Sequence, residues 1–247
     1  MDGNPYELLK NYTNARVALG KAGNSLNTKE ILKFRLAHAL ARDSINSVID
    51  FSHLADGLGK ISLNTICVQS QVADLNEYLR NPDKGKVLEN QSVNQLRGLK
   101  GGKADLCIII ADGLSANAVN ISAVILVEKL LPLIKNLNIA PVILAKFGRV
   151  ALSDQIGEIM HANISLILIG ERPGLSSPAS MGAYITFNPE TGNTDDKRNC
   201  VSNIHSEGLS YEAAALKISW LINQMLLKQI SGVNLKDYLI GGILNNL

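Results

Sequence analysis

The chain has 247 residues, of which 46% are hydrophobic and 4% aromatic, and it carries 24 basic against 22 acidic residues. This is long and apolar enough to bury a sizeable core, and a net charge of +2 is too small to indicate nucleic acid as a main partner. Three widely spaced cysteines, Cys67, Cys107 and Cys200, form no C-x-x-C pair. They argue against a disulfide framework, a zinc finger or a redox dithiol, and fit a reduced cytosolic setting.

Neither export nor membrane insertion is indicated. The first ten residues, MDGNPYELLK, contain no basic region followed by an apolar stretch. The longest apolar runs, at 106–111 and 166–169, are far shorter than the roughly 18–20 residues that a membrane span needs. We therefore expect a cytoplasmic protein that does not enter a membrane.

Residues 1–60 are expected to form an N-terminal helical segment. Residues 1–27 are polar and rich in Gly and Asn, and Thr28 is the predicted N-cap of a helix over 29–42 with apolar residues at helical spacing. We expect that apolar face to pack against the rest of the chain. The basic residues of the segment are expected to face solvent or a partner: Arg16, Lys21, Lys29, Lys33 and Arg35.

Residues 61–103 are interpreted as a connecting region. ISLNTICVQ, at 61–69, alternates as an extended segment does, and short helices broken by Pro82 and Gly85 are predicted after it.

From residue 104 onward, strands alternate with helices. Buried strands are predicted at 104–111, 140–147 and 163–170, with a fourth at 183–189. Pro132 is expected to kink or restart the first intervening helix, and Ser153 or Asp154 to cap the second. A long helix is predicted from its N-cap Ser210 to Gly232. This alternation predicts an α/β domain over 104–247, with a mostly parallel, Rossmann-like sheet flanked by helices.

Polar segments follow the predicted strands, at 112–115, 146–150, 170–174 and 199–205, and the first three contain Gly. Ligands bind such sheets at the carboxyl ends of the strands, so together these segments favour a binding crevice. Each also has a simpler structural explanation. Asp112-Gly113 is a common turn pair and Ser115 a common N-cap; Arg149 could pair with Glu158 or Glu171; Cys200 could be a small buried filler.

Several catalytic and binding motifs are missing. The chain has no G-x-G-x-x-G after a strand, no P-loop and no H-E-x-x-H, and its four histidines are scattered. No nucleophile has a matched base nearby in the sequence. The residues alone indicate a binding protein more than a complete catalyst.

Four strings occur in an order and spacing that resemble the small (light) subunit of ethanolamine ammonia-lyase: IADGLSANAV, FGRVALSDQIGEI, LILIGERPGL and NCVSNIHSEG. ARVALGKAG, upstream of the first predicted helix, resembles the same family, so the likeness runs from about Ala15 to Gly232. It implies the cofactor-binding, non-catalytic subunit of a two-chain lyase that converts ethanolamine to acetaldehyde and ammonia by a radical route.

The resemblance also implies a cofactor, a partner and a site. Adenosylcobalamin would lie between this chain and a large (β/α)-barrel subunit, in an assembly with six copies of each. The family's cobalamin contacts map onto Val150, Glu171 and Cys200. Asn203-x-His205-x-x-Gly208 is close to the D-x-H-x-x-G string of enzymes in which a histidine binds cobalt, but Asn stands where Asp would orient the imidazole. The family implies that the cofactor keeps its own base, so His205 is not expected to bind cobalt.

Both ends depart from the family pattern. A longer segment before the ARV string is associated with microcompartment targeting, and the short leader here leaves packaging in a bacterial microcompartment open. The apolar C-terminal tail, which includes Tyr238, Leu239, Ile240, Ile243 and Leu244, could dock on a partner or fold back on the core. Two alternatives to the lyase subunit remain, a stand-alone module for a nucleotide-like ligand and a scaffold for a large partner.

Overall fold

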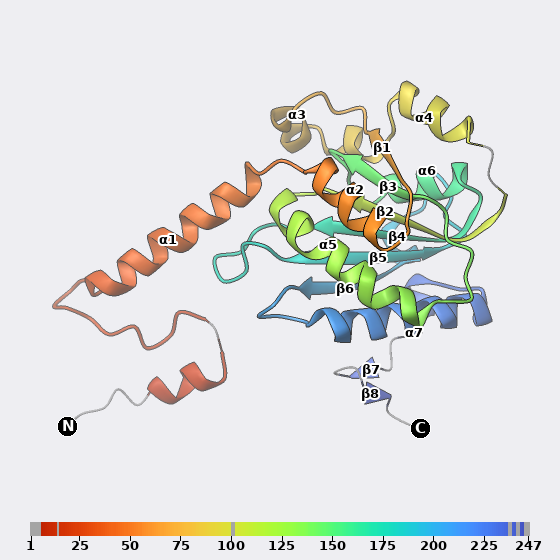
Figure 1. The fold of residues 1–247 in the computed structure, drawn as a ribbon. Coiled ribbons are helices and arrows are strands. Elements are labelled where there is room, and N and C mark those ends of the chain that lie inside the picture. The colour runs from red at the N-terminus through yellow and green to blue at the C-terminus, as the bar shows by residue number, and fades with distance from the viewer. Residues whose placement is uncertain (1–5, 14, 100–101, 237–238, 241–242, 245–247) are drawn as a thin grey trace.

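The structure is a computed structural model that describes residues 6–13, 15–99, 102–236, 239–240 and 243–244. A six-stranded sheet of order β1-β3-β2-β4-β5-β6 lies at its centre (Figure 1). In chain order the strands are β1 (Thr65–Gln69), β2 (Ala104–Ala111), β3 (Val142–Lys146), β4 (Ala162–Gly170), β5 (Met181–Phe187) and β6 (Arg198–Ile204).

The sheet combines parallel and antiparallel pairs. The neighbours β1 and β3, β3 and β2, and β2 and β4 are parallel, whereas β5 is antiparallel to β4, and β6 to β5. The predicted α/β class is confirmed, but the sheet is mixed. The reason lies in the connections: no α-helix lies between β4 and β5 or between β5 and β6, and a parallel neighbour needs a long crossover.

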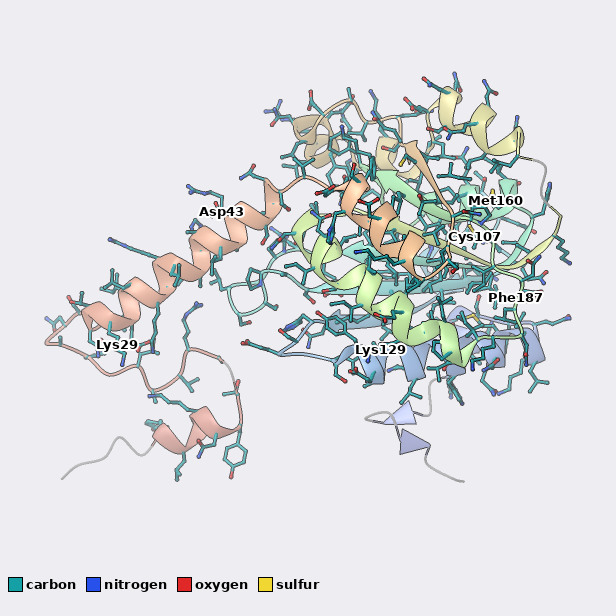
Figure 2. The ribbon with its side chains drawn as sticks, viewed as in Figure 1. Lys29, Asp43, Cys107, Lys129, Met160 and Phe187 are labelled. Carbon is teal, nitrogen blue, oxygen red and sulfur yellow. The ribbon has the colours of Figure 1, made fainter. Side chains whose placement is uncertain are left out.

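Helices cover both faces of the sheet. One face carries α2 (Phe51–Lys60), α5 (Ala116–Leu130) and α7 (Tyr211–Lys228), and the other carries α4 (Asn90–Arg97) and α6 (Leu152–Ile159). Strand β2 serves both cores, because Leu106 and Ile108 point into the first and Cys107 and Ile109 into the second. Figure 2 shows Cys107 within this buried centre. Burial on both faces explains why these strands are continuously apolar.

The connecting region contributes to the same sheet. Its strand β1 pairs with β3 in parallel register, and the short helix α3 (Leu75–Arg80) and the 3-10 helix η2 (Pro82–Lys86) follow. The predicted division of the chain at residues 60 and 103 stays a prediction.

Two predicted N-caps are confirmed and two are wrong. The Ser115 and Ser210 side chains accept from the backbone N–H three residues on, at the start of α5 and α7. Asn27, one residue before Thr28, caps α1 (Thr28–Ile45). Ser153 and Asp154 lie inside α6, and no side chain caps that helix.

Two helix ends also have identifiable causes. Helix α5 ends at Leu130 and a 3-10 turn, Leu131–Leu133, contains Pro132, which matches the expected interruption. Helix α7 stops at Lys228, earlier than the predicted Gly232, because Gln229 adopts a left-handed conformation with φ 55°.

By length and composition alone, the stretch 116–133 could span a membrane. In the structure it comprises α5 and the following 3-10 turn, and α5 packs on the sheet through residues such as Val119, Ala123 and Leu126. Apolarity here reflects burial in the core.

The N- and C-terminal parts differ from the body. Helix α1 projects away from the sheet (Figure 1). At the other end, β7 (Leu239–Ile240) and β8 (Ile243–Leu244) pair in antiparallel fashion. Their side chains, and all of Tyr238, lie outside the described residues, so both interpretations of the apolar tail stay predictions.

Candidate functional site

The chain directions bring the four predicted segments to one edge of the sheet. Strands β2, β3 and β4 are parallel and end at this edge, and β6 returns to it because it is antiparallel to β5. Backbone contacts join the segments. Leu114 N donates to Gly170 O at 3.0 Å, and Asn203 N donates to the Glu171 carboxylate at 3.3 Å.

Asp112 is a buried tie between two of these segments. Only 7% of the residue is exposed, and its carboxylate accepts from the backbone N–H groups of Gly113 (3.0 Å), Phe147 (2.8 Å) and Gly148 (3.1 Å). Burial raises the pKa of Asp112 to about 6, against the opposing effect of these N–H donors. Asp112 therefore orders the loop after β3.

The connecting region holds the same loop from its other side. Ser70 Oγ donates to Phe147 O at 2.8 Å, and the Tyr78 hydroxyl donates to Gly148 O at 2.9 Å. The N–H and C=O groups of both loop residues thus have partners, although Phe147 adopts a left-handed φ of 55°. Such a loop is formed before any ligand arrives, and it places Val150, half-buried, at the entrance to α6.

Arg149 belongs to this support. Its guanidinium carbon lies 4.0 Å from the centroid of the Tyr78 ring, and Nη2 donates to Tyr78 O at 2.8 Å. The predicted pairing of Arg149 with Glu158 or Glu171 is wrong, because a cation stacked on an aromatic ring and bonded to its backbone is held away from the surface carboxylates.

Glu171 ties the ends of three strands together. Its half-buried carboxylate accepts from Ser180 Oγ at 2.5 Å and from Asn203 N. A register shift in the pairing of β5 with β6 places Asn203, with φ 62°, in a bulge. A bulge releases backbone groups from the ladder, and this N–H turns to Glu171. Gly182 makes room, since a Cβ there would lie 2.9 Å from Glu171 Oε1.

Cys200 lies in a strand, opposite Tyr184 of β5. The predicted loop at 199–205 is largely β6, and the alternative role of Cys200 as a buried filler is wrong, because the residue is exposed. Its thiol hydrogen-bonds with the Tyr184 hydroxyl. Partial burial raises the pKa of the Cys200 thiol and of the Tyr184 hydroxyl. Both are therefore neutral near pH 7, as donors and acceptors rather than anions.

These residues border an open surface, which we call the β5–β6 shelf and define by Gly182, Tyr184, Cys200 and Ser202. Helix α7 packs on the other face of β5 and β6, where Met181, Ala183, Val201 and Ile204 are buried. Val150 packs against the same core as Tyr184, on the α6 side of the sheet. Glu171 thus stands at the border of the shelf, and Val150 lies on the same side of the sheet.

Tyr184 escaped the sequence-based selection, which considered loops alone. A usable signal was present: in MGAYITF, residues 181, 183 and 185 are apolar and enter the core, so Gly182 and Tyr184 must share the opposite face.

Both ring nitrogens of His205 are engaged. Nδ1 accepts from Glu207 N at 3.3 Å, so the proton is on Nε2, which donates to Asn203 Oδ1 at 2.9 Å. An imidazole bonded in this way offers no free nitrogen to a metal.

Two clefts in the body lie elsewhere. A cleft of about 270 Å³ is lined by Leu96, Pro141 and Met160, near the amino ends of β2, β3 and β4, and a polar one of about 720 Å³ by Lys103, Glu158 and Asn163. Val150, Glu171 and Cys200 line neither cleft. The shelf, on which Cys200 is exposed, is separate from both clefts.

Comparison with known proteins identifies relatives of the whole chain. The family model described as ethanolamine ammonia-lyase light chain matches residues 3–236. A protein of Bradyrhizobium diazoefficiens is 47% identical over 232 residues, covering 93% of this chain and 89% of its own. One of Pseudomonas aeruginosa is 45% identical over 239 residues, with 95% and 88% covered, and one of Rhodopseudomonas palustris is 46% identical over 231, with 93% and 88% covered. Each is named ethanolamine ammonia-lyase small subunit.

Proposed function

Because the chain belongs to the family of ethanolamine ammonia-lyase light chains, we propose that it is the small subunit of such a lyase and holds adenosylcobalamin against a large subunit. The observation that carries the proposal is the β5–β6 shelf. Cys200, which the resemblance assigns to cobalamin, lies on this open surface. Of the two other assigned residues, Glu171 borders the surface and Val150 lies on the same side of the sheet.

The side chains of the shelf fit a flat cofactor rich in amide groups. Cys200 is small and exposed, so a broad ring can approach β6 closely. The Glu171 carboxylate and the hydroxyls of Tyr184 and Ser202 supply hydrogen-bonding groups, each worth roughly 0.5–1.5 kcal/mol net. The engaged ring of His205 supports a cofactor that keeps its own base. When bound, the cofactor supplies the radical chemistry that converts ethanolamine to acetaldehyde and ammonia.

This chain contributes binding and shielding rather than a reacting group. The Cys200 thiol is held neutral, and Glu171 is occupied by Ser180 and Asn203. The loop before Val150 is held by Asp112, Ser70 and Tyr78 and provides a rigid surface on the same side of the sheet. In this proposal the large subunit closes the open side, supplies the substrate site and keeps water from the reacting atoms. The assembly contains six copies of each chain and works in the cytoplasm.

Thiol footprinting tests this arrangement, because the chain carries its own controls. Cys200 of β6 and Cys67 of β1 are both exposed and lie in opposite edge strands, while Cys107 is buried. The assembled two-chain protein is treated with N-ethylmaleimide, with and without adenosylcobalamin, and labelling at each cysteine is measured by mass spectrometry. We expect the cofactor to slow labelling of Cys200 at least tenfold and to leave Cys67 unchanged.

Equal labelling of Cys200 with and without the cofactor, in a complex that binds cobalamin, would place the cofactor elsewhere. The same preparations test the division of labour. Ammonia release should require both chains, ethanolamine and adenosylcobalamin, and turnover by this chain alone would contradict the proposal.

A further inference from the structure

Exposed apolar side chains are concentrated in one part of the molecule, residues 6–48, which we call the N-terminal arm. Among the described residues, ten of the twenty exposed large hydrophobic side chains belong to this arm. The arm makes up 43 of the 247 residues, so the concentration is about threefold over the chain average. Apolar surface gathered in this way marks a contact with another molecule.

The best-defined part of this surface is a stripe on α1. Leu32, Leu36 and Leu40 follow one another at intervals of four, so they lie along one side of the helix, and they are 58%, 62% and 46% exposed. Another part of the arm contacts a different side of α1: the Arg16 guanidinium lies 5.3 Å from the centroid of the Phe34 ring. The leucine stripe is left facing outward.

The arm leaves the body at the edge of the sheet where β2, β4 and β6 end. The base of α1 is buried at Ala41 and Ser44. Just beyond α1, Ser47 Oγ accepts a hydrogen bond from Asn117 N at 2.8 Å. Asn117 lies in the first turn of α5, which begins directly after the loop that follows β2. Figure 2 shows Asp43 near the body and Lys29 at the far end of the helix. A partner that covers the shelf is therefore within reach of the arm.

The charge of the arm helps to decide whether the leucine stripe contacts a second copy of this chain or the large subunit. Residues 6–48 contain seven Lys or Arg and three Asp or Glu, a net +4, while the whole chain is +2, which leaves −2 for the remaining residues. Pairing of two arms from identical chains would bring +4 against +4, which is unfavourable. Resting on the proposed function, which supplies the partner, we propose that the leucine stripe of α1 docks in an apolar groove with acidic borders on the large subunit.

Photo-crosslinking in the assembled protein tests this directly. The photoreactive residue p-benzoylphenylalanine replaces Leu36 or, as a matched control, Leu227, which is 77% exposed near the end of α7. We expect Leu36→p-benzoylphenylalanine to crosslink to the large chain and the Leu227 variant not to do so. A crosslink from position 36 to a second copy of this chain, or none to the large chain in an intact complex, overturns the proposal. Failure of the two chains to associate at all would instead refute the proposed function.

Affinity gives a second readout. Leu36→Asp should weaken association with the large chain at least tenfold relative to Leu227→Asp, with unchanged circular dichroism of the isolated chain. Because the arm is basic, association of the unmodified chains should also weaken with added salt. Equal affinities of the two Asp variants would overturn the docking role of the stripe.

Discussion

Helices α5 and α1 show how differently the body and the arm use apolar residues. Both are long, with apolar residues spread around much of the helix. Eight residues of α5 are buried between the sheet and α7, whereas only Ala41 and Ser44 of the 18 residues in α1 are buried. A helix that is apolar on several sides needs partners on several sides. The body supplies them to α5, and for α1 the proposed large subunit does.

The largest loss of stability is expected when the buried ion pair of the body is broken. Arg198 and Asp154 join β6 to α6, with side chains 2% and 1% exposed. Arg198→Met leaves the Asp154 carboxylate buried without its partner, so we expect the free energy of unfolding to fall by about 3–5 kcal/mol in urea titrations. Adding Asp154→Leu should recover much of the loss. A single-variant loss below about 1 kcal/mol would mean that water reaches Asp154, or that its carboxyl takes up a proton, in place of the lost ion pair.

One substitution made in both regions sharpens the comparison. Leu126→Ala in α5 removes a fully buried side chain and should cost about 2–5 kcal/mol, because the rigid core keeps a cavity. Leu36→Ala in α1 removes a side chain that is 62% exposed and should change the stability of the isolated chain by about 0.5 kcal/mol or less. Thermal or urea unfolding of both variants measures this difference. Similar losses would show that α1 packs on the body after all.

A smaller effect tests the loop network at the edge of the body through pH. The folded pKa of Asp112 is raised from 3.8 to about 6, so between these values the folded state binds more protons than the unfolded state. The stability due to this group is complete below pH 4 and is lost as the pH rises through 6. A pKa shift of about two units corresponds to at most about 3 kcal/mol in the free energy of unfolding.

Asn cannot titrate, so the Asp112→Asn variant lacks this pH dependence. As the pH rises from 4 to 7, the free energy of unfolding of the unmodified protein should fall relative to that of the variant. Urea unfolding at several pH values measures the change. A relative gain would show that the three N–H donors outweigh burial and lower the pKa of Asp112 below its ordinary value.

Much of the site could be predicted from the sequence, because local pattern and strand direction suffice for it. Continuous apolar runs predicted β2, β3 and β4, and the segments after them do meet at one edge. Strand β6 escaped prediction because its residues, RNCVSNI, are mostly polar, with only Val201 and Ile204 facing the core. Tyr184 and the stacking of Arg149 on Tyr78 escaped because they depend on contacts between segments that are distant in the chain.

The sequence by itself determined the α/β class, the strands of the parallel part, the N-caps Ser115 and Ser210, and the family. Those properties follow from periodicity, capping chemistry and long strings of residues, all of which are local. Only the tertiary structure decided that β5 and β6 form an antiparallel extension with an open face, and that Asp112 and Glu171 act as ties between loops. It also decided that the leucines of α1 face outward. Burial and long-range hydrogen bonds depend on which distant segments meet, and no local pattern specifies that.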